Sequence, residues 1–141
     1  PPEHFARISP ADSLKRKQYI KGLVQLAEEG AVHLYKEPTI GTETYIVGVV
    51  GILQLEVLEH RLKAEYGVSL RQQAQNYTMA RWVLPADNGL YPDLDQLSLS
   101  STTLLVLDKQ ERPVLLFESA WALSWALERN PGLQLAEIEQ V

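Results

Sequence analysis

The chain has 141 residues, 45% of them apolar and 22% charged, so it is long enough to bury a core and is neither disordered nor fibrous. It has no cysteine, which excludes disulfide frameworks, thiolate zinc sites and cysteine nucleophiles. The net charge is −5, and residues 1–84 are nearly balanced while residues 85–141 carry the acidic excess, which argues against a uniformly basic nucleic-acid-binding protein.

The first half of the chain predicts an alternation of strands and helices. Apolar and β-branched runs indicate the strands, and apolar residues spaced i, i+3, i+4 and i+7 indicate the helices. The predicted elements are, in chain order, a strand at 3–8, a helix at about 13–30, strands at 31–37 and 44–50, a helix at 52–66 and a strand at 68–75. This order is typical of a ferredoxin-like split βαβ fold of the α+β class, in which two helices cover one face of an antiparallel sheet.

Short polar residues and glycines predict where these helices begin and end. The side chain of Asp12 or Ser13 can accept from the free N–H groups of the first helical turn. Gly30 can end the first helix in a left-handed conformation, and Gly67 can stop the second. Residues 38–42 (PTIGT) predict a turn between two strands.

The second half predicts a less regular extension. Its elements are a strand at 78–84 with Trp82 facing the core, a loop at 85–95, a hairpin with arms at 104–107 and 113–117, and a helix from a Ser119 cap through Arg129. On this last helix Trp121 and Trp125 are i, i+4 neighbours. We expect both to pack onto the hairpin rather than to stack on nucleic-acid bases, because we expect no basic residue beside them.

Motifs for nucleotide, metal or nucleophile chemistry are absent from the sequence. No GxxxxGK[ST] run is present to hold a nucleoside triphosphate. Glu56 and His60 share a predicted helix but lack the second histidine of a metalloprotease. Asp87, Asp93 and Asp95 lack the spacing of a calcium loop. We therefore expect no catalytic, cofactor-binding or metal-binding residue in this chain.

Four segments, spread in order over nearly the whole chain, point to a family. They are KGLVQLAEEGAVHLY (Lys21–Tyr35), GVVGILQLEVLEHRLKAEYGVSL (Gly48–Leu70), TMARWV (Thr78–Val83) and LERNPGLQL (Leu127–Leu135). Together they resemble the C-terminal domain of bacterial peptide chain release factor 3, a translational GTPase related to elongation factor G. The resemblance implies one domain, with a ferredoxin-like part at 1–76 and a family-specific strand, hairpin and helix at 77–141.

The resemblance also implies a non-catalytic domain that docks on the ribosome. In this family the whole factor uses GTP to promote departure of class I release factors after termination, and GTP and Mg²⁺ would be bound by an upstream G domain. The implied partners are small-subunit RNA and protein of the ribosome and the factor's own G and β-barrel domains. We expect a cytoplasmic monomer with no membrane or DNA partner. The start at Pro1-Pro2 and the single methionine, Met79, lead us to expect a piece of a longer protein.

Seven basic side chains are candidates for contact with ribosomal RNA phosphates. They are Lys15, Arg16, Lys17, Lys21, Arg61, Lys63 and Arg81. The first four lie within two helical turns, and Lys17 and Lys21 share a face, so RNA phosphates could pair with them; a solvated helix face is the alternative. The other three are weaker candidates, because Arg61 can pair with Glu65 and Arg81 can brace the sheet.

Three other functions compete with this hypothesis. The first is the equivalent domain of another elongation factor G-like GTPase, although the third domain of that relative is shorter than this chain. The second is a small-ligand-binding regulatory domain, which predicts a polar pocket between protomers and saturable binding. The third is an acylphosphatase-like enzyme, which needs a phosphate-cradling loop with an arginine where this chain has Ser9-Pro10-Ala11-Asp12.

Overall fold

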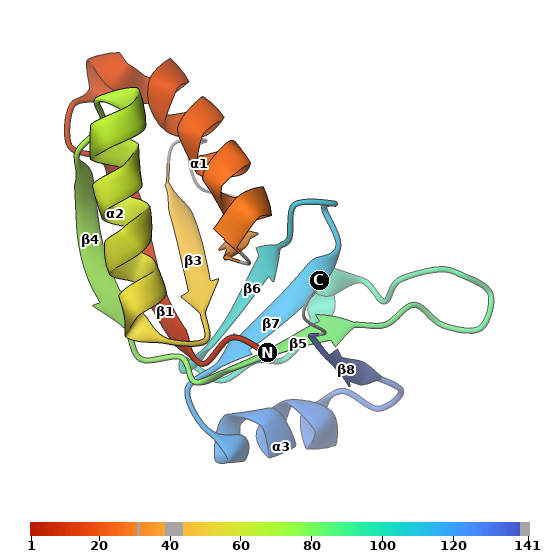
Figure 1. Ribbon diagram of the computed structural model, residues 1–141. Coiled ribbons are helices and arrows are strands. Elements are labelled where there is room, and N and C mark those ends of the chain that lie inside the picture. The colour runs from red at the N-terminus through yellow and green to blue at the C-terminus, as the bar shows by residue number, and fades with distance from the viewer. Residues whose placement is uncertain (31, 39–43, 139–141) are drawn as a thin grey trace.

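The computed structural model describes residues 1–30, 32–38 and 44–138. In these residues the chain forms two four-stranded sheets with helices on their outer sides (Figure 1). The elements are β1 (His4–Pro10), η1 (Ser13–Lys15), α1 (Arg16–Gly30), β2 (His33–Tyr35), β3 (Tyr45–Val49), α2 (Ile52–Tyr66), β4 (Leu70–Gln75), β5 (Met79–Val83), η2 (Leu94–Gln96), β6 (Thr103–Leu107), β7 (Pro113–Phe117), α3 (Ala120–Arg129) and β8 (Leu135–Glu137). No helix in the described ranges is long and apolar enough to cross a membrane.

The first sheet confirms the ferredoxin-like prediction. Its strand order is β2-β3-β1-β4, every neighbouring pair is antiparallel, and α1 and α2 cover one face (Figure 1). All residues of β3 are buried, as its β-branched run predicted. The two helices approach each other closely at Gly22, where a Cβ atom would lie 2.7 Å from the ring of Tyr66.

The predicted helix ends are confirmed except at one glycine. Asp12 Oδ1 accepts from the backbone N–H of Leu14 at 3.0 Å and starts η1, which leads into α1. Gly67 ends α2 in the left-handed region, at φ 68°. Gly30 is the last residue of α1, but it is not left-handed, so that prediction is wrong. Its carbonyl accepts from Gln54 Nε2 at 3.5 Å, which provides a partner without a left-handed turn. The turn predicted at 38–42 lies largely outside the described residues.

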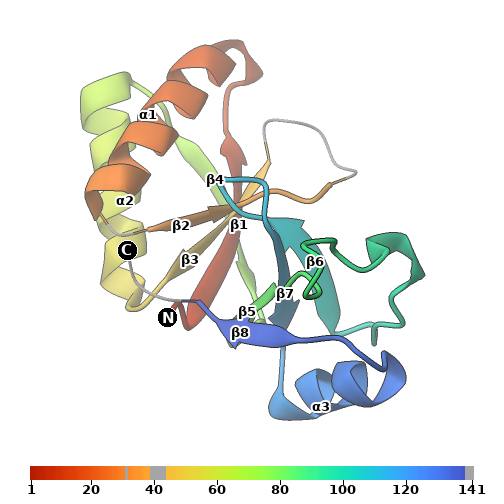
Figure 2. The ribbon, with the colours of Figure 1, turned by 90° about the vertical axis from the view of Figure 1, so that its right-hand side faces the viewer.

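The second sheet has the order β6-β7-β5-β8, with α3 on its outer side (Figure 2). The predicted hairpin is confirmed as the antiparallel pair β6–β7. Ser119 Oγ accepts from the backbone N–H of Ala122 at 3.2 Å, so the predicted cap of α3 is also confirmed. The pairing of β8 with β5 was not predicted, because a three-residue strand is too short to show a period.

A shared apolar layer joins the two sheets. Alternate residues of a strand face opposite sides, so the first sheet uses one set of side chains toward α1 and α2 and the other toward the second sheet. The layer between the sheets consists of Phe5, Tyr35 and Ile46 from the first sheet and Ala80, Val106, Val114, Leu116 and Ile138 from the second half, with Trp82 packed against it as predicted. Lys36 and Leu107 also exchange backbone hydrogen bonds of 2.9 and 2.7 Å, which link the two sheets at their edges.

The two tryptophans of α3 do not pack onto the hairpin as predicted. Trp121 is 64% exposed and Trp125 is half-buried, whereas Ala122 and Ala126 are fully buried. Because the side chains of Ala122 and Ala126 are small, α3 lies close to the second sheet. The indoles of Trp121 and Trp125 then lie on the side of the helix rather than between the helix and the sheet. The expectation that no basic residue lies beside them is also wrong, because the guanidinium of Arg129 lies 4.7 Å from the ring centroid of Trp125.

Candidate functional site

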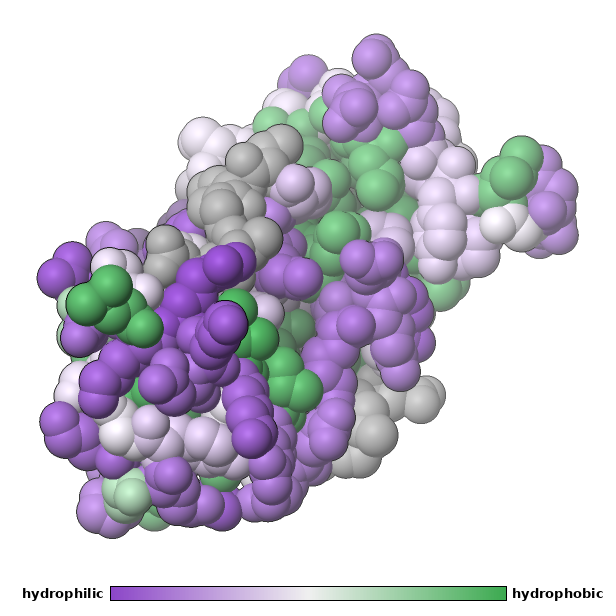
Figure 3. Space-filling view, turned by 90° about the horizontal axis from the view of Figure 1, so that it is seen from above, coloured by the Kyte–Doolittle hydropathy of each residue, from purple (hydrophilic) through white to green (hydrophobic). Residues whose placement is uncertain are grey.

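Most of the candidate basic residues gather at one end of the molecule. The antiparallel arrangement of α1 and α2 places the start of α1, with Lys15, Arg16 and Lys17, beside the end of α2, with Lys63. Lys21 follows Lys17 by one turn on the same face of α1. Figure 3 looks onto this end, and hydrophilic side chains cover much of the nearest surface.

Lys15 and Lys63 have structural partners. Lys15 Nζ donates to the carbonyl of Gly67 at 2.9 Å, at the C-terminal end of α2, where the helix dipole favours a positive charge. Lys63 Nζ donates to Ser69 Oγ at 2.8 Å in the same loop. These contacts hold the end of α2 against the start of α1, so both lysines contribute to the fold at this end.

Lys17 and Lys21 are different, because both are exposed and neither has an ion pair with a described residue. Like charges at i and i+4 on a helix repel each other. A nearby anion outside the chain would therefore relieve an unfavourable interaction within it. We call Lys17 and Lys21 the α1 lysine pair.

Arg61 and Arg81 do not join this group as free cations. Arg61 makes ion pairs with Glu65 (2.6 Å) and Glu29 (2.9 Å), and hydrogen bonds to Glu65 and Glu29 raise the pKa of its guanidinium. Arg81 lies on β5 in the other half, where it donates to the carbonyl of Ala80 at 2.9 Å and lies 3.9 Å from Glu137 on β8. Both arginines thus brace the fold, as the sequence allowed.

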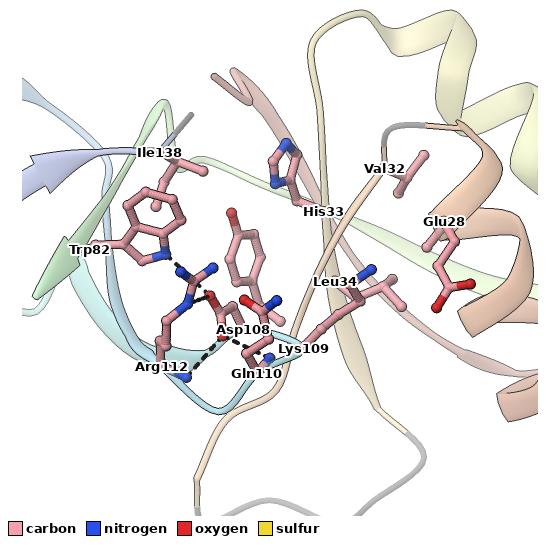
Figure 4. Close-up of a pocket in the computed structure, with 12 residues that line it drawn as sticks. Glu28, Val32, His33, Leu34, Trp82, Asp108, Lys109, Gln110, Arg112 and Ile138 are labelled. Carbon is pink, nitrogen blue, oxygen red and sulfur yellow. Dashed lines mark hydrogen bonds and ion pairs between the residues drawn. The ribbon is translucent and has the colours of Figure 1, made fainter. Parts of the chain in front are cut away.

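A cavity of about 350 Å³ lies where the two halves meet (Figure 4). Its wall comes from the end of α1, from β2, from β5 and from the turn between β6 and β7. The lining residues are Ala27, Glu28, Val32, His33, Leu34, Tyr35, Trp82, Asp108, Lys109, Gln110, Arg112 and Ile138. This volume is in the range of a small-molecule site.

Asp108 organises one wall of this cavity. Its Oδ1 accepts from the backbone N–H groups of Gln110 (3.0 Å) and Arg112 (2.9 Å). Its Oδ2 accepts from Arg112 Nε (2.8 Å) and Trp82 Nε1 (3.2 Å). The guanidinium of Arg112 also lies 4.5 Å from the ring centroid of Trp82 (Figure 4). Both oxygens of Asp108 are thus occupied, and the Trp82 and Arg112 side chains are fixed in place.

Tyr35 lines the same cavity with an unpaired hydroxyl. The residue is 1% exposed, and its hydroxyl oxygen has no hydrogen-bond partner among the described residues. Burial and, less strongly, the charge of Asp108 raise the pKa of Tyr35, so the phenol stays protonated and can donate. The ring of His33 stacks on that of Tyr35 at 6.3 Å and 9°, and burial lowers the pKa of His33, which favours the neutral imidazole.

Sequence reasoning did not find this cavity. Its residues come from four separate segments. The sequence placed Tyr35 only within the predicted strand at 31–37, and it predicted for Trp82 only that it faces the core. The one local signal is the pair Asp108 and Arg112, which are i, i+4 across a hairpin turn. Within the described ranges there is no group of three or more His, Asp or Glu side chains that could hold a metal ion.

Comparison with known proteins identifies the family. A family described as "Class II release factor RF3, C-terminal domain" matches residues 1–127. Relatives named peptide chain release factor 3 include those of Listeria welshimeri and Listeria monocytogenes, each 37% identical over 137 residues, and of Lactobacillus delbrueckii subsp. bulgaricus, 40% identical over 136 residues.

These alignments cover 97%, 97% and 96% of this chain but only 25%, 25% and 24% of the relatives, so the chain spans about a quarter of the length of the curated relatives it matches. The family match and the relatives agree with each other and with the four sequence segments noted above. The chain therefore belongs to the family of C-terminal domains of class II release factor RF3.

Proposed function

We propose that this chain is the ribosome-docking C-terminal domain of a peptide chain release factor 3, the GTP-dependent factor that promotes the release of class I release factors in translation termination. The observation that carries this proposal is the family match over residues 1–127. It favours this function over that of an elongation factor G-like relative. The relatives are about four times as long as this chain, which leaves room for a separate GTPase domain in the parent protein.

In this proposal the chain contributes shape and surface rather than catalysis. GTP and Mg²⁺ are bound by the upstream G domain, and this chain needs no cofactor of its own. Its partners are small-subunit RNA and protein of the ribosome and the factor's own G and β-barrel domains, and it works in the cytoplasm as part of a monomeric factor. The two sheets share an apolar layer, and in this proposal the shape that they form with the outer helices sets the orientation of the whole factor on the ribosome.

The α1 lysine pair supports a contact with RNA phosphates. Lys17 and Lys21 are exposed cations without ion pairs to described residues, and each such contact releases counterions from the RNA. We expect Lys15, Arg16 and Lys63 to contribute less to the affinity for RNA than the α1 lysine pair. Arg61 and Arg81 should contribute little to that affinity, because they have carboxylate partners within the fold.

Ribosome co-sedimentation of the full-length factor, measured over a range of salt concentrations, tests the docking proposal. Lys17→Glu with Lys21→Glu should weaken binding at least about tenfold at low salt and lower the slope of log K against log salt by about two. Arg129→Glu with Lys109→Glu is the matched control, because it also reverses two exposed cations, but both lie in the second half of the chain, away from the α1 lysine pair. Equal affinity and slope in wild type and the Lys17, Lys21 variant would refute the contact.

The non-catalytic role has its own test. The isolated chain incubated with GTP and Mg²⁺ should show no hydrolysis above background, and robust turnover would refute it. The coding sequence directly before Pro1 tests the assignment to a longer factor. The proposal requires a P-loop GTPase followed by a β-barrel at that position.

A further inference from the structure

The wall of the cavity between the two halves carries several hydrogen-bond donors that have no partner among the described residues. Asp108 is saturated, since each of its oxygens already accepts two hydrogen bonds. The unpaired donors are the hydroxyl of Tyr35, one N–H of neutral His33, the terminal nitrogens of Arg112 and the ammonium of Lys109, none of which donates to a described residue. A ligand that brings acceptor atoms would satisfy this set.

The buried hydroxyl is the strongest of these signals. A buried polar group without a partner costs free energy, so most such groups in proteins are paired. Tyr35 is 1% exposed, and its pKa is raised, which keeps it a donor at neutral pH. The hydroxyl is enclosed in this structure, so a ligand reaches it only when side chains of the wall move; Lys109 and Gln110 are exposed turn residues of that wall.

The charged residues that line the cavity favour an anionic group of a ligand on the side of Trp82 and Arg112. Asp108 is neutralised by Arg112, so the remaining cation there is Lys109. Glu28 is the lining carboxylate that repels an anion; it is exposed, and Figure 4 shows it on α1, on the side of the cavity away from Trp82 and Arg112. The rest of the wall is apolar or aromatic, with Trp82 and Ile138 among its members.

We propose that this cavity is a binding site for a small carboxylate with an apolar body. Its oxygens accept from Tyr35 and from Lys109 or Arg112, and its body lies against Trp82 and Ile138. The volume of about 350 Å³ holds a group of the size of a benzoate ion. This site does not depend on the ribosome contact and lies on other elements than the α1 lysine pair.

A benzoate titration followed by NMR tests the proposal. The chain has three tryptophans, and the indole N–H of Trp82 lies in the cavity while Trp121 and Trp125 lie on α3. Benzoate should shift the Trp82 indole resonance saturably, in the millimolar range, and leave the other two unchanged. Benzamide, the neutral isostere, should bind at least about tenfold more weakly, because hydrogen bonds to a charged group are the stronger ones.

Two substitutions locate the binding. Tyr35→Phe should raise the benzoate Kd by about tenfold, and Lys109→Gln should raise it as well. Tyr91→Phe and Arg71→Gln are the matched controls, since they remove an exposed hydroxyl and an exposed cation elsewhere, and they should leave the Kd unchanged. The proposal is overturned by the absence of a saturable Trp82 shift, by equal affinity for benzamide, or by an unchanged Kd in Tyr35→Phe.

A second titration distinguishes two sources of the carboxylate. The peptide Ala-Ala-Phe with a free C-terminus, and its C-terminal amide, are added in competition with benzoate. Displacement by the free peptide alone assigns the site to a peptide end. Failure of both peptides to displace bound benzoate assigns it to a free small acid.

Discussion

Replacing Tyr35 with phenylalanine should stabilise this protein, although most substitutions of a fully buried residue do the opposite. The ring of Tyr35 fills part of the layer between the two sheets, and phenylalanine keeps that ring. The atom that is lost is a hydroxyl oxygen that forms no hydrogen bond within residues 1–30, 32–38 and 44–138. In the unfolded chain the same hydroxyl forms hydrogen bonds with water. Folding removes these hydrogen bonds and does not replace them.

The size of the effect follows from two opposing contributions. Removing an unsatisfied buried hydroxyl gains about 1–3 kcal/mol. Loss of the oxygen's van der Waals contacts and the small void that remains cost roughly 1 kcal/mol or less. We expect a net gain of about 1 kcal/mol in the free energy of unfolding, which for a chain of this length raises Tm by about 3–5 °C.

Urea denaturation at pH 7 measures this difference, with Tyr91→Phe as the control for loss of an exposed hydroxyl. The advantage of Tyr35→Phe should also grow above pH 10. There the unfolded wild-type chain ionises Tyr35 while the folded state, whose pKa is raised, does not, so the wild type loses stability as pH rises. A lower free energy of unfolding for Tyr35→Phe at pH 7 would refute the reasoning, since it would mean that the hydroxyl has a stabilising partner.

Three further predictions concern other positions. Gly22→Ala should lower the free energy of unfolding by about 1–3 kcal/mol, because the added methyl would lie 2.7 Å from the ring of Tyr66, whereas Gly30→Ala meets its nearest atom at 3.8 Å and should be neutral or stabilising in the same urea titrations. Urea midpoints should fall as pH drops below about 6.5, because the unfolded chain binds a proton that folded His33 resists, and His33→Gln should reduce this dependence; an equal slope in both proteins would contradict it. Trp121→Ala should change stability by less than about 1 kcal/mol, because the side chain is 64% exposed, and a loss of 3 kcal/mol or more would show that its indole is covered.

Local sequence patterns were sufficient to predict the ferredoxin-like half. Buried strands such as β3 carry continuous β-branched runs, and the helix boundaries at Asp12 and Gly67 follow from capping chemistry that involves only nearby residues. These features depend on residues that are neighbours in the chain. The periodicity of apolar residues and the positions of turn residues are therefore sufficient to predict them.

Features that depend on contacts between distant segments could not be predicted in this way. The two tryptophans of α3 were predicted to pack onto the hairpin, but the helix buries Ala122 and Ala126 instead. Which of these two helix faces is buried depends on the distance between α3 and the second sheet, and the sequence of the helix does not report that distance. The donor-rich cavity joins Tyr35 to the turn that contains Asp108, which is far away in sequence. Nothing in the sequence around Tyr35 or Asp108 indicates that the two residues lie close together in the fold.

The backbone pairing of Lys36 with Leu107 has a consequence for solubility. The strands β2 and β6 that lead into it stand at the borders of their sheets, where free N–H and C=O groups invite pairing with other polypeptides. By pairing with each other, Lys36 and Leu107 withdraw their own backbone groups from intermolecular strand addition at that point of the two edges. A fragment that ends at residue 76 would lose this pairing together with the apolar cover of Phe5 and Ile46, so it should self-associate more readily than the intact chain.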